Sequence, residues 1–133
     1  MGTRTRWHGF AVRPYSEIAG LESLYLEDSY VLGITEGPSY VRIELEAALT
    51  ENHPAWSPPK AGEQYAYLRA DLIFPNPRRI DWVERSMKPV VGSHGEIDYG
   101  NIDGFTWQAN WFDLRGEWGH LRIESDAPVV TTP

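Results

Sequence analysis

The chain has no cysteine among its 133 residues. This absence excludes disulfide bonds, thiolate metal ligands and a cysteine nucleophile, and it fits a reducing compartment. No apolar run approaches the ~20 residues of a membrane span, and no apolar stretch follows the N-terminal arginines as it would in a signal peptide. We therefore expect a cytoplasmic protein that does not enter a membrane.

Positive charge is also scarce. The chain has 12 lysines and arginines against 19 aspartates and glutamates, which gives a net charge of −7. Non-specific binding to nucleic acid requires clusters of cations that displace counterions, and the longest basic feature is the pair Arg78 and Arg79. We expect no nucleic-acid partner. An acidic surface favours solubility, or association with a basic partner.

Long amphipathic helices are missing, and alternating apolar and polar residues take their place. Period-two alternation predicts half-buried β-strands. The predicted strands cover residues 24–35, 40–49, 64–74 and 80–84, followed by a hairpin over 105–124 with a β-bulge near Trp111 and a turn at Gly116. Residues 7–12 favour a further short strand and residues 15–21 one helical turn. Two long loops, 50–63 and 87–101, are rich in proline or glycine.

The strand pattern predicts the fold class. About six short strands with glycine and proline turns are typical of a single, mainly β domain over residues 1–133. We expect an antiparallel β-sandwich or a partly open barrel with little helix.

Asp28 interrupts the alternation of the first predicted strand. The even positions from Leu24 to Ile34 are otherwise apolar or aromatic, so the pattern places Asp28 on the buried face. A buried carboxylate is costly unless it is hydrogen-bonded or paired. Asp28 is therefore either a structural anchor at an irregular strand position or a general acid or base in a site.

Acidic residues also gather in the glycine-rich segment 94–104. Glu96, Asp98, Asp103 and His94 join Asp28 as candidate catalytic residues. The segment shares its Asn-x-Asp-Gly piece with a calcium loop, but the remaining ligand positions lack carboxylates, so we expect no metal site and interpret these residues as turn formers. The histidines are too scattered for a zinc motif.

Aromatic residues are abundant, with six tryptophans and seven tyrosines. Trp107, Trp111 and Trp118 are interpreted as core, with a ligand-stacking platform as the alternative. Trp56 lies in the proline-rich loop and is the best candidate for an exposed anchor. The predicted partner-binding residues are Trp56, Glu27 and Glu96. No nucleophile elbow, phosphate loop or dinucleotide fingerprint occurs, so we expect no cofactor.

The first hairpin resembles a known group of proteins. Residues 26–34, which read LEDSYVLGI, and the following VRIEL resemble the opening hairpin of small bacterial β-rich proteins. This group includes domains of unknown function and immunity-protein-like families linked to polymorphic toxins. Asp28 and Ser29 match the pattern, whereas Glu27 stands where the pattern has histidine. The closing hairpin, 111–124, is loosely similar too. The resemblance implies an antiparallel β fold and an interaction role, with no established chemistry.

These observations favour a non-enzymatic, immunity-like domain that binds a protein partner. The alternative is an enzyme or a small-molecule or sugar-binding barrel, whose cavity would be lined by Asp28, Tyr30, Asp98 and Asp103. Paired carboxylates in one cleft are what acid–base chemistry requires. A homodimer formed through an edge strand is a third alternative.

Overall fold

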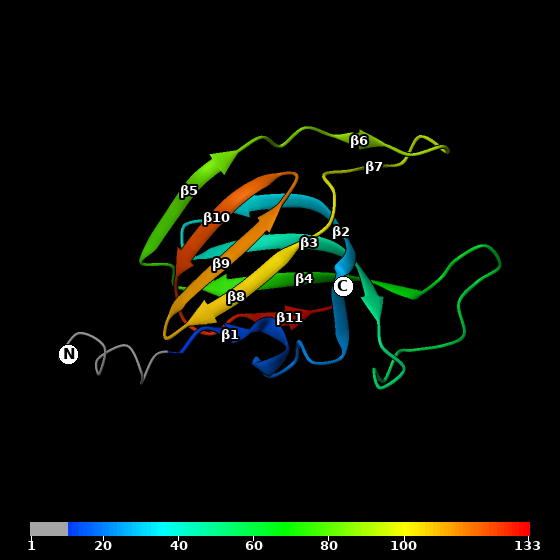
Figure 1. The fold of residues 1–133 in the computed structure, drawn as a ribbon, viewed down its shortest axis with the longest axis horizontal. Helices are drawn as coiled ribbons and strands as arrows, with labels where there is room; N and C mark the ends of the chain where they lie inside the picture. Colours follow the sequence, from blue (N-terminus) through cyan, green and yellow to red (C-terminus); the bar gives the residue numbers. More distant parts are fainter. Residues whose placement is uncertain (1–10) are drawn as a thin grey trace.

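The protein is a β-sandwich, seen in a computed structural model that describes residues 11–133 (Figure 1). One antiparallel sheet has the order β11 (Val129–Thr131), β4 (Ala66–Pro75), β3 (Tyr40–Leu49) and β2 (Leu24–Glu36). The other has the order β1 (Arg13–Pro14), β8 (Gly104–Gln108), β9 (Trp111–Gly116), β10 (Gly119–Glu124) and β5 (Arg79–Arg85). A separate ribbon pairs β6 (Val90–Val91) with β7 (Ile97–Asp98). The predicted mainly β, antiparallel class is confirmed, and neither sheet closes into a barrel.

The core lies between the two sheets. On β3, the predicted apolar face is confirmed, because Val41, Ile43, Leu45 and Ala47 are all fully buried. The opposing sheet contributes residues such as Phe112, Leu114, Leu121 and Ile123, and the turn between β9 and β10 contributes Trp118. Burial of this apolar surface is the main force that holds the sheets together.

The structure differs from the predicted number of strands. Seven strands of five or more residues lie in the described part of the chain, together with four of two or three residues. The predicted helical turn is represented by the 3₁₀ helix η1 (Tyr15–Glu17). Most of the short strand expected over residues 7–12 lies outside the described residues, and so does His8.

The predicted buried position of Asp28 is wrong. The register of β2 against β3 jumps from the pair Tyr25–Ala48 to the pair Tyr30–Glu46, so the intervening residues form a bulge. Ser29 is fully buried there. Its hydroxyl donates to the Tyr25 carbonyl at 2.7 Å and accepts from the Ala48 amide at 2.9 Å. The bulge turns Asp28 and Tyr30 to the outer face of the sheet, where Asp28 is half-buried.

The strand expected to run past Trp111 with a bulge is instead two strands. β8 and β9 pair antiparallel, with Gln108 opposite Trp111, and the chain reverses at Ala109 and Asn110. Ala109 adopts a positive φ of 54°, as tight turns require. The parity break in the sequence therefore marks a turn rather than a bulge.

The tryptophans of the closing strands divide between core and surface. Trp118 is fully buried, and Trp107 packs against the core while its indole donates to the Pro14 carbonyl at 3.0 Å. Trp111 is half-buried outside the core cluster, with the Arg122 guanidinium 5.1 Å from its ring centroid.

Two projections extend from the same end of the sandwich, at the right of Figure 1. One is the loop of residues 50–65, and the other is the β6–β7 ribbon. Residues 99–102 lead from the ribbon back along the edge of β2, where backbone hydrogen bonds join Val31 to Tyr99 and Gly100. Within residues 11–133, no helix has the length and apolarity required to cross a membrane.

Candidate functional site

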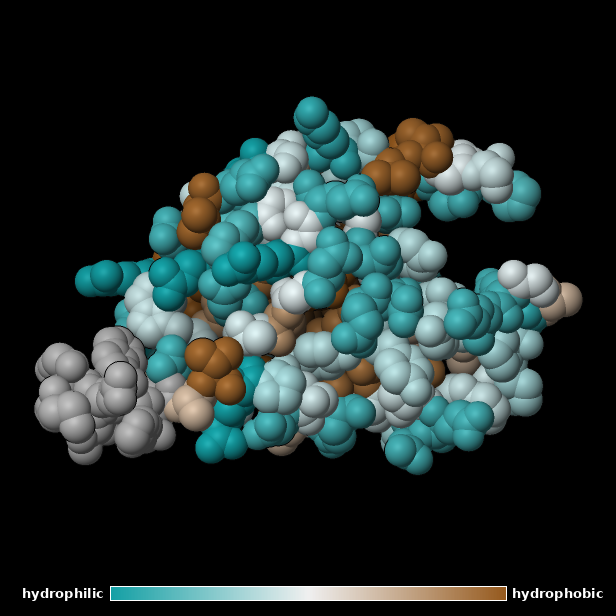
Figure 2. Space-filling view, in the orientation of Figure 1, coloured by the Kyte–Doolittle hydropathy of each residue, from teal (hydrophilic) through white to brown (hydrophobic). Residues whose placement is uncertain are grey.

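An open depression of about 730 Å³ lies on the outer face of the four-stranded sheet, between the two projections. The gap between the projections is visible at the right-hand end of the space-filling view (Figure 2). The outward face of the sheet, the loop and the ribbon all contribute to its lining: Asp28, Tyr30, Leu32, Glu46, Gly62, Glu63, Gln64, Tyr65, Tyr67, Gly92, Glu96, Ile97, Asp98 and Asn101. We call this the acidic depression.

The charge of the lining is entirely negative. The lining includes Asp28, Glu46, Glu63, Glu96 and Asp98, and it has no lysine, arginine or histidine. Among the ion pairs of the described residues, none involves any of these five carboxylates. Like charges gathered in a concave surface produce a strong negative potential, which attracts cations.

Neutral donors hold three of the carboxylates in place. The Tyr65 hydroxyl donates to Asp28 Oδ2 at 2.9 Å. The backbone amide of His94 donates to Glu96 Oε2 at 3.0 Å, and that of Gly100 donates to Asp98 Oδ1 at 2.7 Å. These bonds orient the carboxylates without neutralising them, so their charge remains available to a ligand.

Four tyrosines form a row across the same face. Ring centroids are 5.5 Å apart between Tyr25 and Tyr65, 6.3 Å between Tyr65 and Tyr67, and 6.0 Å between Tyr67 and Tyr30. Ala48 lies between Tyr25 and Tyr67 in the strand register and is fully buried although it points outward. A small residue there lets the rings pack over the sheet.

Tyr65 and Tyr67 stay neutral at physiological pH. Burial, reinforced by the neighbouring Tyr30 hydroxyl, raises the pKa of Tyr67 to about 12. The hydrogen bond to Asp28 is the main cause that raises the pKa of Tyr65. The rings therefore offer aromatic faces and hydroxyl donors, while the negative charge resides on the carboxylates.

A second, smaller depression of about 430 Å³ adjoins the first. Its aromatic walls are Trp56 from the loop, Tyr25 from β2, and Tyr65. The rest of the lining consists of Leu49, Thr50, Glu51, Asn52, Pro59 and Gln64. Gln64 and Tyr65 also line the acidic depression. We call this the aromatic depression.

The structure brings together some of the residues predicted from the sequence. Asp28, Glu96 and Asp98 line the acidic depression, as does Tyr30. His94 and Asp103 are exposed and do not belong to its lining.

The predicted partner-binding residues are spread out. Glu96 lines the acidic depression, whereas Glu27 is exposed and accepts a hydrogen bond from the Tyr15 hydroxyl. Burial is the main cause that raises the pKa of Tyr15, and the Glu27 contact adds to it. Trp56 is half-buried and packs against the core, so it is a wall of the aromatic depression rather than the freely exposed anchor predicted.

Four lining residues of the acidic depression were not among the site residues predicted from the sequence: Glu46, Glu63, Tyr65 and Tyr67. The outward positions of the predicted strands 40–49 and 64–74 were the available signal, since Glu46, Tyr65 and Tyr67 all lie there. A polar outward face is ordinary in a half-exposed sheet, so it did not mark a site.

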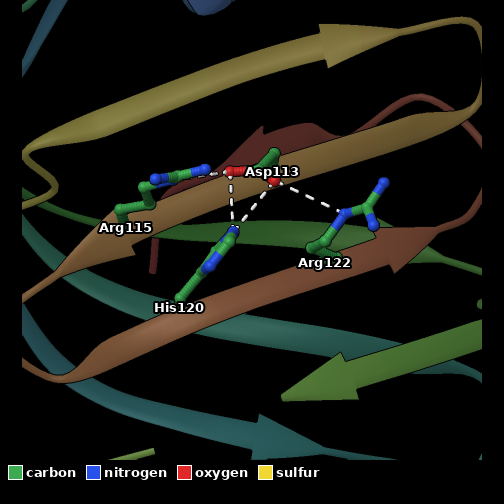
Figure 3. A network of polar contacts seen from close by, with 4 residues as sticks. All are labelled: Asp113, Arg115, His120 and Arg122. Atoms are coloured by element: carbon green, nitrogen blue, oxygen red, sulfur yellow. Dashed lines mark hydrogen bonds and ion pairs between the residues drawn. The ribbon is translucent and has the colours of Figure 1, made fainter. Parts of the chain in front are cut away.

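A polar network on the other sheet serves as a comparison (Figure 3). Asp113 on β9 lies 2.9 Å and 3.0 Å from His120 Nε2 through its two oxygens, and it also contacts Arg115 Nε at 3.2 Å and Arg122 Nε at 3.4 Å. Burial alone would raise the pKa of Asp113, but hydrogen bonds from His120 and Arg115 outweigh it and lower that pKa. This carboxylate already has cationic partners, whereas those of the acidic depression form no ion pair among the described residues.

The carboxylates of the depression are spread apart rather than gathered round one point. Across residues 11–133, no group of three or more histidine, aspartate or glutamate side chains is arranged to hold a metal ion. The charge is distributed over the depression, which suits a larger cationic ligand better than a single ion.

Comparison with protein-family models, with curated proteins and with solved structures finds no match.

Proposed function

We propose that this protein is a non-enzymatic, immunity-like interaction domain that binds a positively charged region of a protein partner in the acidic depression. The observation that carries the proposal is the set of five carboxylates without ion pairs, around a depression of about 730 Å³ whose lining has no cationic side chain. The net charge of −7 supports the same preference for a basic partner.

The tyrosines favour an organic cation over an inorganic one. Lysine and arginine side chains bury their aliphatic stems against apolar surface, and their charged groups bind aromatic faces as well as carboxylates. Tyr30, Tyr65 and Tyr67 supply such faces beside the carboxylates. Tyrosine is also among the residues that contribute most to the energy of protein interfaces.

Affinity capture with matched baits tests this function. The triple-acid variant carries Asp28→Asn, Glu96→Gln and Asp98→Asn. The control variant carries Asp81→Asn, Glu84→Gln and Asp103→Asn, which change the net charge equally at exposed positions outside the depression. Wild type and control should capture the same basic protein from native lysate at equal stoichiometry, and the triple-acid variant should not.

Calorimetric titration with the captured protein then measures the Kd of wild type and of each variant. Removing charged interface groups typically costs tenfold or more in affinity. We expect Kd to rise by more than about tenfold in the triple-acid variant and to stay within about twofold of wild type in the control. Equal binding by both variants would refute a role for the depression.

A sugar or another small molecule is the second candidate ligand, in an enzyme or a binding protein. It is favoured by the meeting of Asp28 and Asp98 in one depression with tyrosine faces. Binding of a neutral glycan would be insensitive to salt, whereas a basic partner dissociates as salt rises. Calorimetry at two ionic strengths therefore separates the two candidates.

A further inference from the structure

We infer that the acidic and aromatic depressions form one groove for an extended segment of the partner, with basic side chains over the acidic depression and an apolar side chain against Trp56. This inference rests on the proposed function and specifies the form of the ligand.

The two depressions lie side by side and share walls. Gln64 and Tyr65 line both of them. The tyrosine row crosses this boundary, because Tyr25 lines only the aromatic depression while Tyr67 and Tyr30 line only the acidic one. Consecutive rings in the row lie within 6.3 Å of each other, so no gap interrupts the surface.

The spacing of the row matches an extended chain. Side chains on one face of a strand are about 6.6 Å apart, twice the rise per residue. The tyrosine ring centroids are 5.5 to 6.3 Å apart. The rings zigzag across β3, since Tyr25 on β2 and Tyr67 on β4 lie opposite each other with Ala48 between them. An extended peptide that crosses the sheet can therefore meet rings from both strands, as in other complexes that recognise linear segments.

The two ends of the groove differ in chemistry. Five carboxylates line the acidic depression, and Glu51 is the one acidic residue in the lining of the aromatic depression. At that end, the half-buried Trp56 packs against the core, which fixes it in place, and Pro59 is exposed beside it. Rigid aromatic walls of this kind anchor apolar side chains at interfaces. The groove thus has a strongly acidic end and an end where aromatic walls stand among neutral polar residues and a single glutamate.

Fluorescein-labelled synthetic peptides test the inference by fluorescence anisotropy. The probe contains three lysines, a two-glycine spacer and a phenylalanine, made with the phenylalanine at either end. A second probe replaces phenylalanine with serine. Both are titrated against wild type, the triple-acid variant, Trp56→Ala and Tyr25→Ser. Tyr25 is 41% exposed, so its substitution preserves the fold even if Trp56→Ala destabilises the loop.

For one of the two probe orientations, the phenylalanine probe should bind wild type at least about fivefold more tightly than the serine probe. That advantage should vanish in Trp56→Ala and in Tyr25→Ser, while lysine-dependent binding persists. If the advantage is absent in wild type or survives in both variants, the groove is refuted, although the proposed function stands as long as the triple-acid variant loses binding. If the triple-acid variant binds the probes as tightly as wild type, the proposed function fails as well.

Discussion

The Tyr65 hydroxyl donates to Asp28 Oδ2 at 2.9 Å and so joins the last loop residue before β4 to the bulge of β2 across the intervening strand β3. This bond orients a carboxylate that has no ion pair. Tyr65→Phe should therefore weaken binding of a labelled hexalysine peptide about two- to fivefold, because Asp28 loses its fixed orientation.

Spectrophotometric titration checks the same bond. Since the bond to Asp28 raises the pKa of Tyr65, Tyr65→Phe should remove a phenol that ionises later than a free tyrosine. Tyr40→Phe, at the far end of β3, is the control for both measurements. Unchanged peptide affinity and loss of only an ordinary phenol would contradict this role of the bond.

The buried serine of the bulge should be important for stability. Ser29→Ala removes a hydroxyl that bonds both the Tyr25 carbonyl and the Ala48 amide. Leaving these buried backbone groups unpaired should lower the free energy of unfolding by about 1–3 kcal/mol, measured by urea denaturation. Ser57→Ala, at an exposed loop position, should change it by less than about 0.5 kcal/mol. Similar effects of the two substitutions would refute a structural role for the bulge serine.

Gly119 begins β10 with φ of 139°, and a Cβ there would collide with the Glu84 carbonyl of β5. Gly119→Ala should therefore lower the free energy of unfolding by more than about 2 kcal/mol, since strain and collision add. Gly20 has φ of 91° with open space around it, so Gly20→Ala measures the backbone strain alone and should cost about 1 kcal/mol. Thermal unfolding of both variants gives the comparison, and an equal loss would show that the close approach of β5 is unimportant.

The lowered pKa of Asp113 makes the stability of the fold depend on pH. Its pKa is lowered in the folded state, so its contacts stabilise the fold above the unfolded pKa of about 3.9, and this stability is lost as pH falls through the folded value. Asp113→Asn should lower the free energy of unfolding by about 1 kcal/mol at pH 7. The difference in the free energy of unfolding between wild type and Asp113→Asn should disappear by about pH 2. Exposed Asp81→Asn is the control, and a difference independent of pH would contradict the assignment.

The strands follow from the sequence where the pattern is uniform. Residues 40–47 alternate regularly after a glycine-proline turn, and the predicted strand 40–49 coincides with β3. The bulge in β2 was hidden because Tyr30 and Leu32 maintain the apolar alternation after it while facing outward, and the residue that turns inward is the polar Ser29. The turn between β8 and β9 was hidden because Ala109 is an unusual residue for a positive φ.

The site follows from the sequence only in part. The alternative cavity of Asp28, Tyr30, Asp98 and Asp103 has three of its four residues in the acidic depression, and Asp103 lies outside it. The sequence offers these residues but does not show that they converge. Tyr65 reaches Asp28 over a separation of 37 residues. Such contacts depend on strand order and on the bulge, and neither is encoded in local periodicity.

The most direct test of the account is NMR mapping of hexalysine binding on the ¹⁵N-labelled protein. We expect saturable amide shifts to gather at Tyr30, Tyr65, Tyr67, His94 and Gly100, since these residues line the acidic depression or hold its carboxylates. The shifts should disappear at high salt and in the triple-acid variant, but not in the control variant. Shifts that gather instead on the outer face of the five-stranded sheet, or that survive in the triple-acid variant, would contradict it.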